Sequence, residues 1–171
     1  MKPFWSDLGK LISSKTSQEE DFIKNVQLFT DLTRRERLKV ERLMHVREYQ
    51  AGEYIFHKGQ PGAAFYVIRS GLVRIVTPGE PPILLAEVNP GEVIGELAIL
   101  DETPRSASAL TAEHATTMAI FKGDFDAFML SEPVIAAKIY RRLAIVIGNR
   151  LKATNAMLQK QAAKQPETRP A

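Results

Sequence analysis

The sequence AGEYIFHKGQPGAAFYVIRSGLVRI, at Ala51–Ile75, decides the fold that we predict for this chain. Three runs rich in aromatic and β-branched residues, YIFH, AFYVIR and LVRI, are separated by the turn signals GQPG and SG. Such runs are typical of β-strands, and glycine and proline between them are typical of tight turns. This stretch therefore predicts a succession of short strands.

The same pattern continues on the C-terminal side of this stretch. Further β-type runs are ILLAEV at Ile83–Val88, SASALT at Ser106–Thr111 and TTMAIF at Thr116–Phe121. The turn signals PGEPP and NPGE lie before and after the first of them. Short runs at this spacing indicate a compact antiparallel barrel or sandwich.

Helical signals precede the predicted strands. Ser17 with Glu20, and Thr33 with Glu36, have the spacing of a capping box, in which a hydroxyl and a carboxylate satisfy backbone amides at a helix start. Apolar residues at helical spacing follow each pair. We therefore predict a helical segment before the strands.

Helical signals also follow the strands. Asp124 is expected to cap a short helical turn, and the sequence SEP at 131–133 opens a longer helix with proline near its start. An apolar stripe along this helix comprises Tyr140, Leu143, Ile147, Leu151 and Leu158. A stripe of this kind indicates a helix that packs against its own domain or against a second copy.

Composition limits the classes of protein that this chain can be. With 171 residues, 44% hydrophobic and 25% charged, it reads as one ordinary globular domain with extensions. It has no cysteine, which excludes disulfides and thiolate metal sites, and its three histidines lack metal-ligand spacing. No apolar run approaches the length of a membrane span or a signal peptide, so we expect a cytoplasmic location.

The stretch IGELAILDETPRSASA, at Ile94–Ala109, offers a polar cradle beside the apolar strands. Gly95 allows close approach of a backbone to a ligand, and Glu96 can accept hydrogen bonds from a sugar hydroxyl. Arg105 supplies a planar fork suited to two phosphate oxygens, and Ser106 adds a hydroxyl and an amide. These groups together predict a site for a sugar phosphate.

GELAIL and PRSASA closely resemble the two halves of the phosphate-binding cassette of cyclic nucleotide-binding domains. Such domains occur in catabolite activator proteins, cAMP-dependent kinase regulatory subunits and gated channels. The resemblance implies a mainly β fold with flanking α-helices, a double-stranded β-helix or jelly-roll β-roll, with an N-terminal helical segment and a long C-terminal helix. It further implies that Glu96 holds the ribose 2′-hydroxyl and that Arg105 pairs with the cyclic phosphate.

The resemblance also implies a full set of ligand-binding residues. The predicted set is Ile94, Gly95, Glu96, Leu97, Ala98, Arg105, Ser106 and Ala107. Polar candidates on the long helix, expected to cover the base, are Arg150, Thr154 and Asn155. The serine at 106, where cGMP-selective relatives often have threonine, favours cAMP over cGMP. We predict no catalytic residue, no metal and no cofactor besides this ligand.

The chain divides into three predicted parts. Residues 1–16 form an N-terminal extension with apolar residues on one helical face, and residues 166–171 form a disordered tail. Between them, residues 17–165 form the cyclic nucleotide-binding domain. Its expected subdivisions are a helical lead-in at 17–45, the β-roll at 46–123 with the cassette at 94–109, and the lid helices at 124–165.

Two functions of different classes fit these features. The first is a sensor that passes ligand binding through its C-terminal helix to an unknown protein partner or to a second copy, as a homodimer. The second is an interaction protein whose nucleotide pocket is vestigial; a hidden phosphodiesterase is disfavoured because no metal cluster or evident nucleophile is present.

No helix-turn-helix follows the long helix, so we expect a stand-alone domain without direct DNA binding. Membrane contact through residues 1–15 is less favoured than packing of that segment on its own domain.

Overall fold

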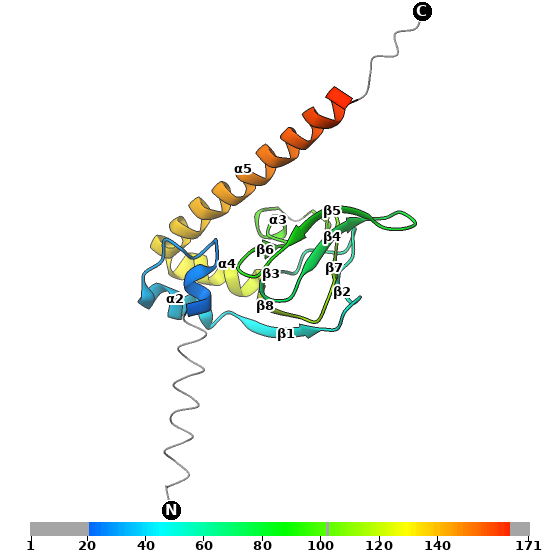
Figure 1. The fold of residues 1–171 in the computed structure, drawn as a ribbon. Helices are drawn as coiled ribbons and strands as arrows, with labels where there is room; N and C mark the ends of the chain where they lie inside the picture. The colour runs from blue at the N-terminus through cyan, green and yellow to red at the C-terminus, as the bar shows by residue number, and fades with distance from the viewer. Residues whose placement is uncertain (1–20, 102, 165–171) are drawn as a thin grey trace, which may run out of the picture.

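The computed structural model describes residues 21–101 and 103–164, in which eight strands form two four-stranded antiparallel sheets (Figure 1). One sheet has the order β1-β8-β3-β6 and the other the order β2-β7-β4-β5. The strands are β1 (His45–Tyr49), β2 (Tyr54–Phe56), β3 (Ala64–Ser70), β4 (Val73–Thr77), β5 (Ile83–Val88), β6 (Val93–Ile94), β7 (Ser108–Thr111) and β8 (Ala115–Phe121). The predicted jelly-roll fold class is confirmed.

The β1-β8-β3-β6 sheet is covered on both faces. In β3, Phe65 and Val67 point to one side and join the core formed with the helices. The alternate residues Tyr66 and Ile68 point to the other side, into the core shared with the second sheet. This alternation follows from the two-residue period of a strand. The sequence AFYVI, at 64–68, has no charged residue because this part of the strand is buried from both directions.

The sheets are flanked by helices α2 (Arg34–Glu41), α3 (Leu97–Leu100), α4 (Lys122–Ser131) and α5 (Pro133–Lys164). The capping box of Thr33 and Glu36 is confirmed, because each side chain accepts a hydrogen bond from the backbone amide of the other. The prediction for Asp124 is wrong: α4 starts at Lys122, with Phe121 at the N-cap and Asp124 in the first turn. There its negative charge still faces the positive end of the helix dipole.

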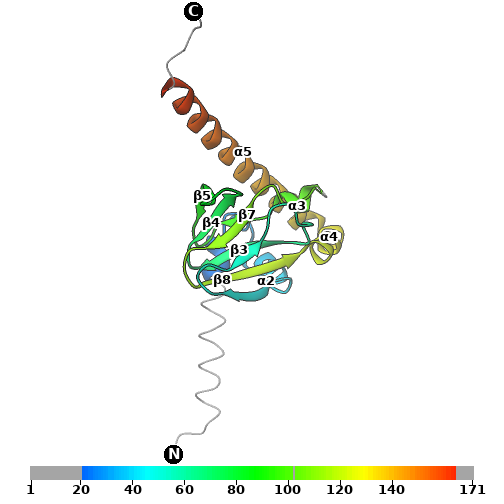
Figure 2. The same cartoon turned by 90° about the vertical axis from the view of Figure 1, so that its right-hand side faces the viewer.

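Helix α5 has two unlike halves. Ile139, Leu143 and Val146 in its first half are buried against the helical core, whereas residues 151–160 are all exposed. Figures 1 and 2 show from two directions that the second half runs clear of the β-roll. None of the described helices is long and apolar enough to cross a membrane, and the cytoplasmic location stays a prediction.

Ion pairs fasten α2 and its preceding turn to the start of α5. Lys138 pairs with Glu36 at 2.7 Å, and Arg141 pairs with Asp31 at 2.8 Å. Both pairs join residues about a hundred positions apart in sequence, so they close the helical layer across the fold. The predicted N-terminal extension at 1–16, the capping pair at Ser17 and Glu20, and the tail at 166–171 lie outside the described residues.

Candidate functional site

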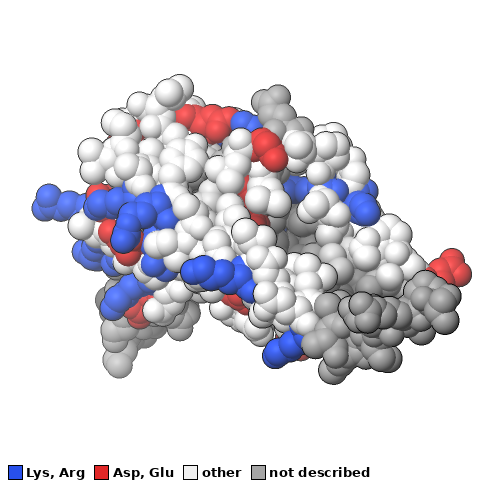
Figure 3. All heavy atoms as spheres, turned by 90° about the horizontal axis from the view of Figure 1, so that it is seen from above, with Lys and Arg blue, Asp and Glu red and all other residues white. Residues whose placement is uncertain are grey.

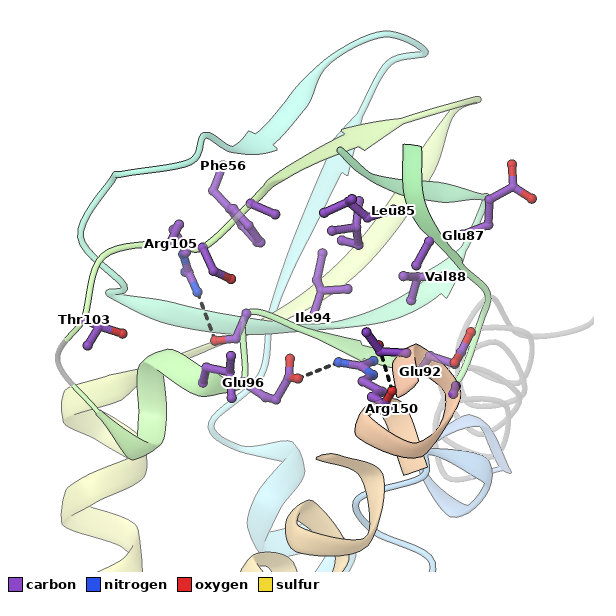
Figure 4. Close-up of a pocket in the computed structure, with 18 of the residues that line it drawn as sticks. Phe56, Leu85, Glu87, Val88, Glu92, Ile94, Glu96, Thr103, Arg105 and Arg150 are labelled. Atoms are coloured by element: carbon purple, nitrogen blue, oxygen red, sulfur yellow. Dashed lines mark hydrogen bonds and ion pairs between the residues drawn. The ribbon is translucent and has the colours of Figure 1, made fainter. Parts of the chain in front are cut away.

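A pocket of about 380 Å³ lies between the β2-β7-β4-β5 sheet, the cassette and α5 (Figure 4). Its lining mixes apolar strand residues with charged groups from the cassette and the helix. The lining residues are Phe56, Ile75, Leu85, Ala86, Glu87, Val88, Glu92, Ile94, Gly95, Glu96, Leu97, Thr103, Pro104, Arg105, Ser106, Ala107, Arg150, Ala153, Thr154 and Met157. The cassette and α5 thus face one cavity, although more than forty positions in the sequence separate the lining residues Ala107 and Arg150.

The guanidinium of Arg105 is held by backbone and by an aromatic ring. Its Nη1 donates to the carbonyl of Gly95 at 2.9 Å, and its Nη2 donates to the carbonyl of Ala64. Its central carbon lies 4.2 Å from the centroid of the Phe56 ring, within cation–π range. Three strand-anchored groups therefore fix a side chain that is only 8% exposed.

Gly95 makes room for this arginine. The residue has φ +70°, a conformation that side-chain-bearing residues rarely adopt. A methyl group on its Cα would overlap the guanidinium of Arg105. The sequence-based expectation was that Gly95 lets a backbone approach a ligand; in the structure, the neighbour that approaches it closely is Arg105.

Glu96 lies beside Arg105 and is 5% exposed. Its Oε1 accepts a hydrogen bond from Nη1 of Arg150 at 2.5 Å, and Nη2 of the same arginine donates to the carbonyl of Val93. Figure 4 shows Glu96 and Arg150 pointing toward one another, with Arg105 on the other side of Glu96. This bridge is a direct polar link between the cassette and α5.

The charges in this pocket are unequally neutralised. Glu96 has an ion-pair partner in Arg150, whereas the partners of the Arg105 guanidinium among residues 21–101 and 103–164 are neutral carbonyls. Burial lowers the pKa of Arg105, and nearby Tyr66 and Glu96 partly offset that effect. A guanidinium remains protonated in a protein even so, and a buried cation is stabilised by a nearby anion. The arrangement favours an anion beside Arg105.

The structure brings most of the predicted site residues to this pocket. Nine of them line it: Ile94, Gly95, Glu96, Leu97, Arg105, Ser106, Ala107, Arg150 and Thr154. Ala98 lies in α3. Asn155 is exposed on α5 and is not among the lining residues. The roles assigned to all these residues stay predictions.

Sequence reasoning missed most of the apolar lining on the strands and on α5, of which three large residues are examples. Phe56 on β2, Leu85 on β5 and Met157 on α5 each contribute to the wall. Met157 lies two helical turns after Arg150, on the same face of α5. A helical wheel that places Arg150 in the pocket therefore also places Met157 there. Phe56 and Leu85 carry no such signal, because the sequence does not show which strand face points inward.

Comparison with known proteins agrees with this geometry. Residues 46–132 match the family model described as the cyclic nucleotide-binding domain. The "Cyclic AMP receptor protein" of Thermus thermophilus is 37% identical over 108 residues, which is 62% of this chain and 48% of that protein. A cyclic nucleotide-gated potassium channel of Mesorhizobium japonicum is 30% identical over 131 residues, 73% of this chain and 35% of the channel.

A solved structure supports the same assignment. The regulatory domain of Toxoplasma gondii PKA, crystallised with cAMP, superposes with a TM-score of 0.62 at 26% identity, covering 75% of this chain and 51% of that one. The chain spans about half, or less, of the length of the relatives described above. On the match of the family model to half of its length, the chain belongs to the cyclic nucleotide-binding domain family.

Proposed function

We propose that this chain is a cAMP sensor without catalytic activity, which transmits ligand binding through α5. The observation that carries the proposal is the buried Arg105 guanidinium, which no carboxylate of the described part of the chain binds directly, beside the buried carboxylate of Glu96. A cyclic nucleotide presents the matching pair of groups, an anionic phosphate next to a ribose hydroxyl. The similar Thermus protein is named as a cyclic AMP receptor, which supports cAMP as the ligand.

The phosphate would bind at Arg105. Two of the arginine's N–H groups already hold carbonyls of Gly95 and Ala64, so the side chain is positioned before any ligand arrives. Little side-chain entropy is then lost on binding, and the charge of the phosphate is met by a fixed cation. Ser106, exposed at the pocket, can add a hydroxyl donor.

The ribose would bind at Glu96. Arg150 contacts its Oε1, which leaves Oε2 to accept a hydrogen bond from the 2′-hydroxyl. A carboxylate that binds both the sugar and α5 couples the two. The base would then lie between the apolar residues of β5 and those of α5, including Leu85 and Met157.

Coupling through α5 follows from how the helix is held. At the pocket, its polar anchor is Arg150, which reaches Glu96 and the Val93 carbonyl. If the ligand binds more tightly when α5 covers the base, binding shifts the equilibrium toward the covering position of the helix. The size of the shift is set by the difference in affinity between the two positions. The output therefore depends on α5 and on whatever contacts its exposed second half.

We propose a second copy of this chain as that contact. Leu151 and Leu158, seven residues apart on one face of α5, are each more than half exposed along the part of the helix that leaves the β-roll. A long helix with an uncovered apolar stripe is suited to pairing with an identical helix. Analytical ultracentrifugation with and without cAMP tests this: a dimer that Leu151→Ser/Leu158→Ser dissociates supports the proposal, and a monomer in both states contradicts it.

Calorimetric titration of the full chain with cAMP, cGMP and 5′-AMP tests the ligand. We expect saturable binding with cAMP bound more tightly than cGMP, and weak binding of 5′-AMP because its phosphate is not cyclised. Hydrogen exchange on the same samples should show slower exchange in residues 94–109 and in α5. Failure of all three nucleotides to bind would instead support an interaction protein with a vestigial pocket.

A further inference from the structure

The charge of this chain is divided between its two layers. Residues 45–121, which form the β-roll, carry five Lys and Arg against nine Asp and Glu, a net charge of −4. Residues 21–44 and 122–150, which supply the helices packed on it, carry eleven against seven, a net charge of +4. Figure 3 shows Lys and Arg side chains gathered at the left, the side on which Figure 1 places α2 and the start of α5.

Part of this positive charge forms a stripe on α2. Arg35, Lys39 and Arg42 follow one another at the i, i+4 and i+7 positions, so they share one face of the helix. Lys39 pairs with Glu132 of the α4–α5 junction. Arg35 and Arg42 are exposed and have no ion-pair partner within residues 21–101 and 103–164. Two cations of the stripe are thus available to a ligand.

The stripe leads into a shallow groove of about 520 Å³. The groove is lined by Arg42, Leu43, His45, Asp124, Ala127, Phe128 and Ser131. Leu43 and Phe128 are partly buried against the helical core and give the groove apolar lining, and Arg42 and His45 line it as well. Asp124 is the acidic group of the lining. The groove is separate from the nucleotide pocket, with which it shares no lining residue.

Exposed apolar side chains lie beside the groove. Leu130 is 86% exposed and Val134 is 68% exposed, the highest values among the large apolar side chains of the described residues. They flank Ser131 in sequence, at the junction where α4 ends and α5 begins. Exposed apolar residues beside unpaired arginines are typical of protein interfaces, in which arginine is enriched.

From this arrangement we infer that the groove between α4 and the segment that joins α2 to β1 binds an acidic amphipathic segment of a partner protein. Apolar side chains of that segment fill the groove over Leu43 and Phe128, and its Asp or Glu side chains meet Arg35 and Arg42. Residues 1–15 of this chain carry three lysines and one aspartate, so their charge makes them a poor occupant. A concave groove also suits a peptide better than the flat surface of a membrane.

The test uses the full chain and two fluorescent helical peptides with the same leucine face, one with glutamate on its polar face and one with lysine. We expect saturable binding of the glutamate peptide, weakened by salt, and no comparable binding of the lysine peptide. Arg35→Glu/Arg42→Glu should weaken binding by about tenfold or more, because two attractions become repulsions. Leu130→Ser/Val134→Ser should weaken it as well, and both residues are exposed enough for the fold to persist.

A matched control is Lys152→Glu/Lys160→Glu, which changes the net charge equally on the exposed half of α5. Unchanged peptide binding by this control supports a local site. A loss of affinity equal to that of Arg35→Glu/Arg42→Glu would overturn the inference. Equal binding of both peptides, or wild-type binding by Arg35→Glu/Arg42→Glu, would also overturn the inference. So would a glutamate peptide that does not bind while phosphatidylserine vesicles bind through the same arginines. A mass that halves in Arg35→Glu/Arg42→Glu would assign the surface to a second copy instead.

Discussion

The two walls of the nucleotide pocket are built differently. On the cassette wall, Arg105 is buried, bonded to two backbone carbonyls and stacked on Phe56. On the α5 wall, Arg150 is 39% exposed and is bonded to one side chain and one carbonyl, and Met157 is 60% exposed. A fixed wall supplies affinity without reorganisation, and a loosely held wall can change position when a ligand arrives. Under the proposed function, the cassette recognises the ligand and the helix responds to it.

Removing the fixed cation should break the first wall. Arg105→Ala is expected to weaken cAMP binding by about 2–5 kcal/mol, roughly thirtyfold to several thousandfold, because the phosphate is left without its counter-charge. Arg105→Lys should recover little of the lost cAMP affinity, because an ammonium group cannot bond the same carbonyls and the phosphate oxygens together. Isothermal titration calorimetry measures both variants. Wild-type affinity in Arg105→Ala would place the phosphate elsewhere.

Filling the space at Gly95 should disturb the same wall without removing a charge. Gly95→Ala places a methyl group where the guanidinium lies and forces an L-residue to φ +70°. We expect about 1–2 kcal/mol lower free energy of unfolding and at least about tenfold weaker cAMP binding. Urea denaturation and titration provide the measurements.

Gly123→Ala is the matched control for that substitution. A Cβ there would meet no atom within 4 Å, and the residue lies inside α4. Alanine is the better helix former, so the control should leave binding intact and stabilise the protein by up to about 1 kcal/mol. If the two variants behave alike, the close contact between Gly95 and Arg105 is unimportant.

Breaking the bridge from α5 should separate response from recognition. Arg150→Met keeps the length of the side chain but cannot bond Glu96 or the Val93 carbonyl. We expect an affinity loss of only about three- to tenfold, because the cassette still holds the sugar phosphate. The cAMP-dependent slowing of hydrogen exchange in α5 should disappear, while that in residues 94–109 persists. Full protection of α5 in this variant would show that another contact carries the coupling.

The smallest effect is expected at the base of α5. The hydrogen bond from Lys138 holds the pKa of Glu36 below its usual value, with help from the amide of Thr33. A carboxyl group whose pKa is lower in the folded state stabilises the folded protein at pH values above its unfolded-state pKa. That stabilisation is lost as the pH falls through the folded-state pKa. Lys138→Met should therefore lose less than about 1 kcal/mol at neutral pH and show a shallower loss of stability on acidification. Denaturation at a series of pH values measures the difference, and parallel curves for both proteins would contradict it.

Sequence reasoning succeeded where the residues repeat a local pattern. The runs around Phe65 and Val73 are strands, Thr33 forms its capping box, and α5 begins at Pro133. It missed β1, where four of the five residues are exposed and no apolar alternation exists, and β6, which has only two residues. It could not join Arg150 to Glu96, because that contact depends on how a helix crosses a sheet rather than on neighbouring residues.

The unsupported half of α5 has a mechanical consequence. Between Arg150 and Lys164 the helix rises about 21 Å, at about 1.5 Å per residue. If it pivots as a rigid rod at the Glu96 bridge, each degree of tilt moves its far end by about 0.4 Å. The helix then acts as a lever that pivots at the pocket. A tilt that moves the backbone near Arg150 too little to detect produces a measurable displacement at Lys160. A distance probe is best placed at that distal position. A partner that binds the distal end of α5 has the largest effect on the orientation of the helix at the pocket.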